Sequence, residues 1–402
     1  MRTLYTDKHI PRSLLVKMLK PAWPGVVYSG LSPSRFEVLA PPALPGPRWV
    51  RVENRMCGIC GSDLSILNVE ADPRIAPVAL PGIDRLYLGH ECVSEVVEIG
   101  PAVTRFSVGD RVIMDTRFQG PNCVSQEIDP RCAQCDKGLF TLCENSSCGH
   151  GPVGVGGGWS DGYTCHESEI YPVPSGLNDE QAMMVEPLSV GMRAALLRTP
   201  GEGEHCLIIG SGIVGLATLQ AVRAVSPRAR ITAVARYPHQ VEAARRLGAD
   251  DVLRSDDLFE AASRITGARL YEGLFGNRML LGGFSVVYDC VGSAQTVGES
   301  LRLARGRGSV VLVGIKFAPL RVDLTPVWYQ EVDLVGLYAH GPELFRGERT
   351  NTFRVVIDLL TEGQLTTEGL VTHTFPLSRW KEAVATAQDK RTGAIKVAFR
   401  FD

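Results

Sequence analysis

The feature that most restricts the fold of this sequence is a regular alternation of apolar strands and helical segments that begins at His205. The run His205 to Ile209 is continuously apolar after its first residue, as buried strands are, and Ile213 to Val225 carries apolar residues at helical spacing. Three further strands are expected at Ile231 to Ala235, Val286 to Val291 and Ser309 to Val313. Strands and helices in this alternation predict an α/β fold built on a doubly wound parallel sheet.

A glycine motif, Gly210-x-Gly212-x-x-Gly215, lies between the first of these strands and the helix that follows it. Glycines at these positions allow a tight turn, let the backbone approach a pyrophosphate, and let the helix pack closely on the strand. The chain contains 42 glycines, so the motif alone is weak, but its place between strand and helix is specific. We therefore expect a dinucleotide here, with its phosphates at the helix N-terminus, rather than a turn without a ligand.

The end of the second strand indicates which dinucleotide is bound. An NAD site usually carries Asp or Glu about 20 residues after the glycines, where the acid binds the ribose hydroxyls. Here Ala235 takes that place and Arg236 follows, and a guanidinium can pair with the 2′-phosphate of NADP. The sequence thus favours NADP over NAD, unless Arg236 is only a solvated surface charge. The expected cofactor contacts are Gly210, Gly212, Ile213, Val214, Gly215, Arg236, Val291 and Val313.

The rest of the chain has a different character. Residues 1–47 are rich in proline and glycine and show little periodicity, and short expected strands joined by long loops follow them. A glycine-bearing insertion, Ala268 to Gly283, interrupts the alternating region. We expect a first domain over residues 1–187, a dinucleotide-binding domain over residues 188–337, and a tail over residues 338–402 that returns to the first domain.

Composition argues against several classes of protein. The net charge is −2, which gives no electrostatic reason to bind nucleic acid or an anionic membrane. No apolar run approaches the roughly 18 residues needed to span a bilayer, and the N-terminal residues do not form a convincing signal peptide. We therefore expect a cytoplasmic protein whose 11 cysteines are reduced, and their spacing indicates metal binding rather than disulfides.

One cysteine cluster, Cys132-x2-Cys135-x7-Cys143, has the spacing of a structural zinc site in a lobe of about residues 120–148. Such sites are four-coordinate and closed, and they hold loops that have little core of their own. The fourth ligand is open, because Asp129, Cys123 and Cys148 all lie near the cluster in sequence. Spacing slightly favours Asp129, with Cys123 next, and a cluster of unmetallated thiols is a poorer alternative.

Two separate segments carry cysteine, histidine and glutamate residues whose roles stay open when each is taken alone. Cys60 lies in the run Met56 to Asp63, and Gly89-His90-Glu91 follows further along the chain. Taken alone, Cys57 and Cys60 could be buried small residues or a redox pair, and His90 could be an ordinary core histidine. Which of these explanations holds is decided by the other motifs of the chain taken together.

These motifs together resemble the zinc-dependent medium-chain dehydrogenase/reductase superfamily, which includes alcohol, polyol, glucose and threonine dehydrogenases. The matching features occur in the family's order along nearly the whole chain: Gly58 to Asp63, Gly89 to Glu91, the cysteine lobe, Val185-Glu186-Pro187 and the glycine motif. The resemblance implies a GroES-like, mostly β catalytic domain made from both ends of the chain, with a Rossmann nucleotide domain inserted between them. The Glu-Pro pair makes the polyol, sugar and threonine enzymes a better match than the ethanol-type dehydrogenases.

The resemblance also implies roles for single residues. Cys60 and His90 correspond to the first two ligands of a catalytic Zn2+. In the polyol and sugar branch the third protein ligand is the residue at the position of Glu91 or the one at the position of Glu186, so both stay open. Asp63 corresponds to the carboxylate that steadies the ligand histidine.

The activity implied by the resemblance is the reversible oxidation of a secondary alcohol, on a polyol, cyclitol, sugar or amino alcohol, to a ketone. Zinc lowers the pKa of the substrate hydroxyl, Ser62 accepts the proton, and hydride passes to the nicotinamide of NADP or NAD. Some relatives continue the proton path through a histidine where this chain has Ser65. Alternatives are a double-bond reductase of the same fold that lacks catalytic zinc, and a non-catalytic NADP-binding protein. Members of the superfamily are usually homodimers or homotetramers.

Overall fold

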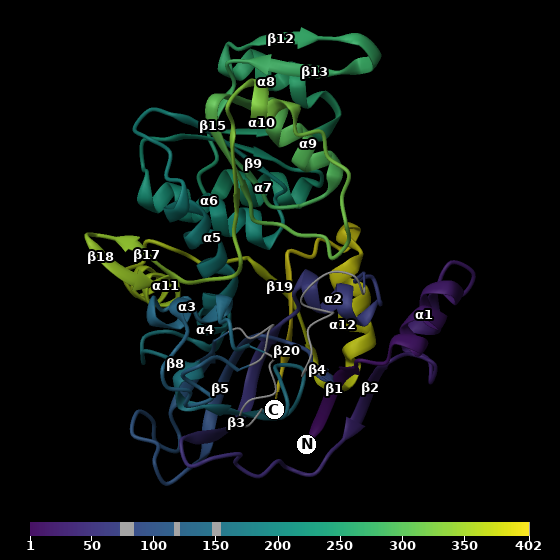
Figure 1. Ribbon diagram of the computed structural model, residues 1–402, viewed down its shortest axis with the longest axis vertical. Helices are drawn as coiled ribbons and strands as arrows, with labels where there is room; N and C mark the ends of the chain where they lie inside the picture. Colours follow the sequence, from purple (N-terminus) through teal and green to yellow (C-terminus); the bar gives the residue numbers. More distant parts are fainter. Residues whose placement is uncertain (73–83, 116–120, 147–153, 402) are drawn as a thin grey trace. The chain divides into compact units, whose positions relative to one another are not determined.

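The chain forms two compact units in the computed structural model (Figure 1). Unit 1 consists of Met1–Glu186 and Val371–Asp402, and unit 2 consists of Pro187–Leu370. Both ends of the chain therefore belong to the same unit. The structure describes residues 1–72, 84–115, 121–146 and 154–401. None of the helices in these ranges combines the length and the apolarity that crossing a membrane requires.

Unit 1 is built around a seven-stranded sheet. Its strand order is β19-β20-β3-β5-β6-β8, and β7 also pairs with β3. Neighbouring strands are antiparallel, except that β19 and β20 are parallel. Buried side chains from both parts of the unit, among them Val50, Trp159 and Phe399, form its core. The strands are β3 (Trp49–Gly58), β5 (Glu91–Ile99), β6 (Arg111–Met114), β7 (Gly162–His166), β8 (Ile170–Pro172), β19 (Val371–Pro376) and β20 (Lys396–Arg400).

The register of three adjacent strands brings the C-terminal tail close to the N-terminal motifs. Strand β3 pairs with β5 so that Gly58 lies opposite Glu91. Strand β20 pairs with β3 on its other side, with Ala398 opposite Gly58. The first residue of β20, Lys396, is thereby held near the residues that follow Gly58 and near the start of β5.

Residues 1–47, in which the sequence predicts no element, contain two strands and a helix. Strands β1 (Arg2–Asp7) and β2 (Ser34–Val38) pair with β4 (Arg85–Tyr87) in a small antiparallel sheet. Between them lie α1 (Ile10–Leu19) and the 3-10 turn η1 (Pro24–Tyr28). Helix α1 escapes prediction because it has only ten residues and most of its apolar side chains are exposed instead of buried.

The remaining helical elements of unit 1 are short. Helix α2 (Gly61–Leu67) starts directly after Cys60, because Cys60 is its N-cap and the Asp63 carboxylate accepts a hydrogen bond from the Cys60 N–H. The others are α3 (Ala133–Asp136), η2 (Phe140–Leu142), η3 (Glu167–Glu169), α4 (Asp179–Met183), η6 (Leu377–Arg379), α12 (Trp380–Gln388) and η7 (Lys390–Thr392).

Unit 2 contains a six-stranded sheet in which every neighbouring pair is parallel, with the order β11-β10-β9-β14-β15-β16. This is the doubly wound order in which the first strand of the unit lies at the centre, and it confirms the predicted α/β fold. Strand β9 and helix α6 have the predicted bounds. The strands are β9 (His205–Ile209), β10 (Arg230–Val234), β11 (Asp251–Leu253), β14 (Phe284–Asp289), β15 (Ala304–Leu312) and β16 (Asp333–Gly336). The helices are α5 (Val185–Leu197), α6 (Ile213–Val225), α7 (Pro238–Arg246), η4 (Ser255–Asp257), α8 (Leu258–Thr266), α9 (Ala294–Leu303), α10 (Thr325–Tyr329) and α11 (Thr352–Thr361).

Two features of unit 2 differ from or add to the sequence prediction. The chain returns to unit 1 at Val371 rather than at residue 338, because β17 (Pro342–Phe345), β18 (Glu348–Asn351) and α11 still belong to unit 2. Arg193 of α5 fixes this stretch, since its guanidinium lies 3.1 Å from a carboxylate oxygen of Glu343 and donates to two backbone carbonyls beside it. The insertion Ala268 to Gly283 forms a hairpin of β12 (Arg269–Glu272) and β13 (Arg278–Leu281), with the 3-10 turn η5 (Leu274–Gly276) at its tip.

Candidate metal and cofactor sites

Three potential metal ligands predicted from two separate segments meet in unit 1. Cys60 caps helix α2, and His90 and Glu91 lie at the start of β5. One donor atom from each residue lies within 4.8 Å of the others. His90 is 8% exposed and Glu91 is 1% exposed. Sulfur, imidazole nitrogen and carboxylate oxygen thus converge in a nearly closed place, and this mixture of donors fits zinc.

Asp63 ties the two segments of this group together. One of its oxygens accepts from the Cys60 N–H at 3.2 Å, and the other accepts from the Gly89 N–H at 3.0 Å and lies 3.4 Å from His90 Nδ1. A carboxylate at Nδ1 orients the ring for ligation through Nε2. Burial lowers the pKa of His90, but the negative charges of Asp63 and Cys60 outweigh burial and raise it well above its usual value. The pocket therefore stabilises positive charge, as a cation site must.

Glu91 is held from two sides. A Cβ atom at Gly58 would lie 1.9 Å from Glu91 Oε2, so only glycine leaves room for the carboxylate there. Lys396 Nζ lies 2.6 Å from each Glu91 oxygen and donates to the Ile59 carbonyl at 3.2 Å. Both side chains of the ion pair are 1% exposed. Sequence reasoning missed Lys396, although a lysine in the middle of the apolar run Ala394 to Phe399 was a signal that it needs a buried partner.

Two other residues with expected roles lie in unit 1 but outside the three-donor group. Glu186, in the first turn of α5, is 4% exposed. It does not contribute a donor to the Cys60 group, but its charge, with the larger effects of Glu91 and Cys60, raises the pKa of Lys396, which burial alone would lower. Ser62, in the first turn of α2, has a buried hydroxyl with no hydrogen-bond partner among the described residues. Cys57 is fully buried, in keeping with a packing role.

The cysteine lobe contains a second group, and its fourth member differs from the residue that spacing slightly favoured. Four thiols, those of Cys123, Cys132, Cys135 and Cys143, have sulfur atoms within 4.8 Å of one another, and Asp129 is not part of the group. The turn after Cys123 explains this, because the Ile128 N–H bonds to the Cys123 carbonyl at 2.9 Å and folds the chain back. Spacing along the sequence favoured Asp129 only because it ignored that turn. Cys148 lies outside the described residues.

Two of the four thiols, Cys123 and Cys132, accept hydrogen bonds that favour thiolates, whereas burial raises the pKa of Cys135 and of Cys143. The N–H groups of Cys135 and Glu144 point at Cys132 Sγ at 3.5 and 3.4 Å, and the Cys132 N–H and the Asn145 amide point at Cys123 Sγ at 3.5 and 3.2 Å. Burial raises the pKa of Cys132, but the backbone donors outweigh it and bring the pKa to about 6. A closed set of four sulfur donors is the arrangement of a structural zinc site.

The glycine motif of unit 2 forms the turn from β9 into α6. Gly210 has a φ of +96°, and a Cβ atom there would lie 2.5 Å from Val291 Cγ2. A Cβ atom on Gly215 would lie 1.7 Å from the Gly210 carbonyl oxygen, whereas one on Gly212, the N-cap of α6, would meet open space. Two glycines therefore serve close packing, and the third leaves the helix N-terminus accessible, as a pyrophosphate requires.

The other expected cofactor residues lie at the carboxyl ends of the same strands. Ile213 and Val214 open α6. The turn after β14 is held by Asp289, which accepts from the Val291 N–H at 2.9 Å, and Val313, after β15, donates to the Asp289 carbonyl at 3.0 Å. Arg236 follows β10 by two residues and is exposed, with its backbone N–H bonded to Gln240 at 3.2 Å.

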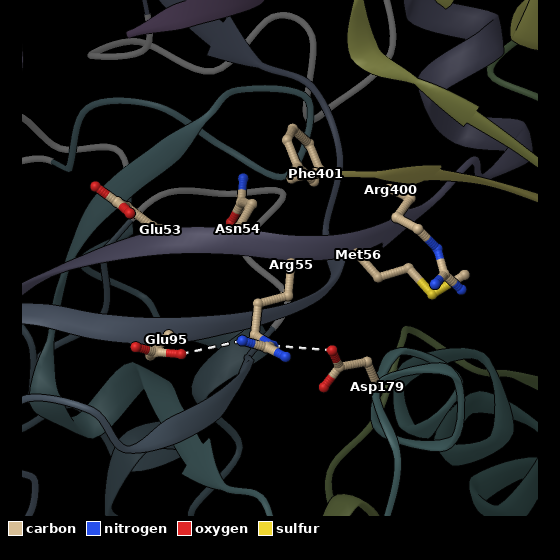
Figure 2. A pocket seen from close by; sticks show the side chains of 8 residues that line it. All are labelled: Glu53, Asn54, Arg55, Met56, Glu95, Asp179, Arg400 and Phe401. Atoms are coloured by element: carbon tan, nitrogen blue, oxygen red, sulfur yellow. Dashed lines mark hydrogen bonds and ion pairs between the residues drawn. The ribbon is translucent and has the colours of Figure 1, made fainter.

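Unit 1 also has a pocket that shares no residue with either ligand group. Figure 2 shows that its most prominent charge, Arg55, is directed between Glu95 and Asp179, at 3.0 and 2.8 Å. Because these charges already satisfy one another, we assign the pocket no catalytic role. Its volume is about 390 Å³, and its lining residues are Glu53, Asn54, Arg55, Met56, Glu95, Asp179, Arg400 and Phe401.

Comparisons with known proteins agree with this arrangement. Residues 46–175 match the family described as alcohol dehydrogenase GroES-like domain, and residues 214–362 match the family described as zinc-binding dehydrogenase. The chain is 31% identical over 363 residues to L-idonate 5-dehydrogenase of Vitis vinifera and 30% identical over 359 residues to sorbitol dehydrogenase of Arabidopsis thaliana, and each match covers 89% of both chains. The structure of 2R,3R-butanediol dehydrogenase from Bacillus subtilis is similar with a TM-score of 0.70 and 25% identity, covering 92% of this chain and 96% of the other.

Proposed function

This chain belongs to the zinc-type medium-chain alcohol dehydrogenase family, and on that premise we propose that it oxidises a polyol-like secondary alcohol at a zinc held by Cys60, His90 and Glu91. The family gives the broader activity: an oxidoreductase that acts on CH–OH groups with zinc and a nicotinamide cofactor and interconverts alcohols and ketones. The observation that carries the finer proposal is the buried three-donor group, fixed by Asp63 on one side and Lys396 on the other.

The donor set suits zinc better than a hard cation. A thiolate and an imidazole are ligands of borderline-soft metals, whereas calcium and magnesium prefer oxygen throughout. With three protein donors, a catalytic site keeps a coordination position for the substrate oxygen. When bound, zinc supplies the Lewis acidity that makes the substrate hydroxyl easier to deprotonate, and the nicotinamide supplies the acceptor for hydride.

In this proposal Glu91, rather than Glu186, is the third ligand. Glu91 contributes an oxygen to the donor group, and a carboxylate oxygen that accepts one hydrogen bond from Lys396 keeps a second lone pair. Lys396 thus positions Glu91 and limits its negative charge. Glu186 is buried within electrostatic reach of Lys396 and balances the lysine charge.

Ser62 is the proposed acceptor of the substrate proton. Its hydroxyl lies two residues from Cys60, is shielded from solvent, and has no partner among the described residues. A buried hydroxyl without a partner is costly unless a ligand satisfies it, so it is well suited to bond the substrate hydroxyl. Because the position five residues after Cys60 is Ser65 rather than histidine, the proton continues from Ser62 by a route without an imidazole there.

The proposed substrate carries hydroxyls on adjacent carbons. The three similar proteins are named for L-idonate, sorbitol and 2R,3R-butanediol, and each of these molecules has such a pair. The exposed Arg236 beyond β10, where an NAD site usually has an acid, supports NADP as the preferred cofactor. Homodimers or homotetramers are the expected assemblies, which light scattering coupled to gel filtration measures directly.

A paired substrate panel tests the proposal. The zinc-loaded protein is assayed with sorbitol, L-idonate and 2R,3R-butanediol, and with 2-butanol as the matched alcohol that lacks the neighbouring hydroxyl, each with NADP and NAD. We expect reduction of the nicotinamide with vicinal diols at a kcat/KM at least roughly tenfold above that for 2-butanol, since a lost hydrogen bond to a buried group is worth about one factor of ten. Equal rates with 2-butanol contradict the substrate class, and full activity of a zinc-free Cys60→Ser variant contradicts the site.

A further inference from the structure

Helix α1 turns an apolar face to solvent. Ile10, Leu14 and Met18 follow one another at a spacing of four and therefore lie on one side of the helix. They are 53%, 49% and 78% exposed, and Leu15 beside them is 40% exposed. A surface helix normally shows its polar side to water, so this orientation is inverted. Figure 1 shows α1 standing out at the edge of its unit.

The opposite face of α1 fixes this orientation. Val16 is fully buried in a small core with Val26, Val27 and Val69. Lys17 Nζ donates to the Ala71 carbonyl at 2.8 Å, and Lys20 Nζ donates to the Asn68 carbonyl at 3.0 Å. With one face anchored by apolar contacts and two lysines, the helix cannot roll to hide Leu14 and Met18. The contacts of the opposite face therefore hold the apolar face of α1 in its exposed orientation.

The surroundings of this face are basic and end in an aromatic residue. Residues 8–36 contain five basic residues and no acidic residue, although the whole chain has a net charge of −2. Lys17 and Lys20 belong to the anchored face, where Lys20 also pairs with Glu70 at 3.2 Å, so Lys8 and Arg12 are the basic residues nearest the apolar face in the sequence. Trp23, just after the helix, is 48% exposed. Electrostatic attraction acts over about 10 Å at ordinary salt, so the local charge, not the net charge of the chain, governs what this face attracts.

We propose that α1 and Trp23 dock the protein reversibly on an anionic lipid bilayer. Apolar side chains on one face, basic side chains at its borders and an aromatic residue at its end are the pattern of an interfacial helix. Ile10, Leu14 and Met18 enter the boundary between headgroups and acyl chains, and Lys8 and Arg12 face the lipid phosphates. The expectation that such a membrane is excluded rested on the net charge and does not hold for this segment.

The chemistry of the face favours lipid over other partners. Nucleic acid would attract the basic residues, but it offers no apolar surface for Ile10, Leu14 and Met18 to contact. A second copy packed on the same face across a two-fold axis brings two acid-free basic segments together, which like-charge repulsion opposes. A single ten-residue helix without a lipid anchor predicts weak, reversible binding that falls as salt rises.

Sedimentation of the full chain with lipid vesicles tests the proposal. Vesicles of phosphatidylcholine with and without phosphatidylserine are compared for the wild type, for Leu14→Asp/Met18→Asp, and for Leu274→Asp/Phe275→Asp. The last variant is a matched control with the same change of charge, because Leu274 and Phe275 at the tip of the β12–β13 hairpin are 84% and 104% exposed. Circular dichroism and dehydrogenase activity in solution establish that each variant is folded.

We expect the wild type to sediment with phosphatidylserine vesicles and to be released by salt. The α1 variant should lose binding by roughly tenfold or more, because two large apolar side chains no longer enter the bilayer, and the hairpin control should bind like the wild type. The proposal is overturned if the wild type stays in solution, if both variants bind like the wild type, or if both lose binding equally. It is also overturned if light scattering shows a dimer that only the α1 variant abolishes, since a second copy then covers the face.

Discussion

The buried pair of Lys396 and Glu91 allows a quantitative test of how the proposed zinc-binding group is held. The lysine makes three hydrogen bonds, two to the carboxylate at 2.6 Å and one to Ile59, and both side chains are 1% exposed. Lys396→Met keeps most of the side-chain length and removes the charge. Removal of one partner from a buried pair leaves the other charge uncompensated, so we expect unit 1 to lose about 3–5 kcal/mol of unfolding free energy.

Zinc should change this loss in a defined direction. In the chelator-treated protein, Glu91 in Lys396→Met has no compensating cation and the full loss appears. With zinc present the cation compensates the carboxylate, so the loss should shrink and the stabilisation by zinc should be larger than in the wild type. The pKa of Lys396 is raised in the folded chain. Its contribution is therefore complete below the ordinary lysine pKa and is lost only as the pH rises through the raised value, so the loss should be constant across the neutral range.

Urea unfolding of both zinc-free and zinc-loaded protein, followed by tryptophan fluorescence, measures these differences. The control is Lys381→Met, which removes an exposed lysine of α12 in the same unit. The double variant Glu91→Gln/Lys396→Met removes both charges and should recover most of the stability, because replacing a whole buried pair by neutral groups is often close to neutral. A loss below about 1 kcal/mol in zinc-free Lys396→Met, or a double variant as unstable as the single one, refutes the reasoning.

Four further predictions follow from other parts of the structure. Cys123→Ala should lose one zinc per chain by elemental analysis while Asp129→Ala keeps it, because the four-sulfur group includes Cys123 and not Asp129; equal zinc contents contradict that ligand set. Arg236→Ala should lower kcat/KM with NADP roughly tenfold or more and leave NAD nearly unchanged, since one charge-assisted hydrogen bond is at stake; a similar drop for both cofactors shows another role. Ser62→Ala should lower kcat about 100-fold or more at unchanged zinc content, and a kcat within a factor of two of wild type removes Ser62 from the proton path. Glu167 accepts hydrogen bonds from Arg48 and from the N–H groups of Thr104 and Arg105. Burial raises the pKa of Glu167, but these donors outweigh burial and lower the pKa overall. The stabilisation by Glu167 is therefore present above the ordinary glutamate pKa and is lost as the pH falls through the lowered value. Glu167→Gln should therefore destabilise unit 1 near neutral pH and flatten the acid limb of its stability curve, and an unaltered acid limb shows that another group titrates there.

The sequence predicted best the elements that are buried on both faces. The run His205 to Ile209 and the helix Ile213 to Val225 coincide with β9 and α6, because a central parallel strand must be apolar along its length and the helix that covers it repeats at helical spacing. The glycine motif was equally readable, since the positive φ of Gly210 and the close approach of Gly215 to the Gly210 carbonyl oxygen act within a few residues. In each case the physical cause of the structure is local in sequence.

The features that sequence reasoning missed depend on contacts between distant residues. Unit 2 extends to Leu370, and the stretch after residue 338 is tied to it by the ion pair of Arg193 and Glu343. No local pattern near residue 338 indicates that ion pair. The choice of Cys123 over Asp129 depends on a turn stabilised by backbone hydrogen bonds, which spacing does not reveal. Helix α1 is a different failure, because its apolar face is turned outward and the usual link between apolar spacing and burial does not hold there.

Lys396 is a residue whose need for a partner is visible in the local sequence, but whose actual partner is set by strand pairing. A lysine between Ile395 and Val397 in a strand is a local anomaly that already requires a buried acid as its partner. Which acid that is depends on the pairing of β20 with β3 and of β3 with β5, and a shift of either register by one residue would turn the side chain to the other face. The pairing register of β20 and β3 places Lys396 beside Glu91, and the need of the buried lysine for an acidic partner in turn disfavours other registers. A variant that exchanges the charges, Glu91→Lys/Lys396→Glu, should keep the fold but lose the zinc proposed at Cys60, because an ammonium then takes the position of the proposed third donor.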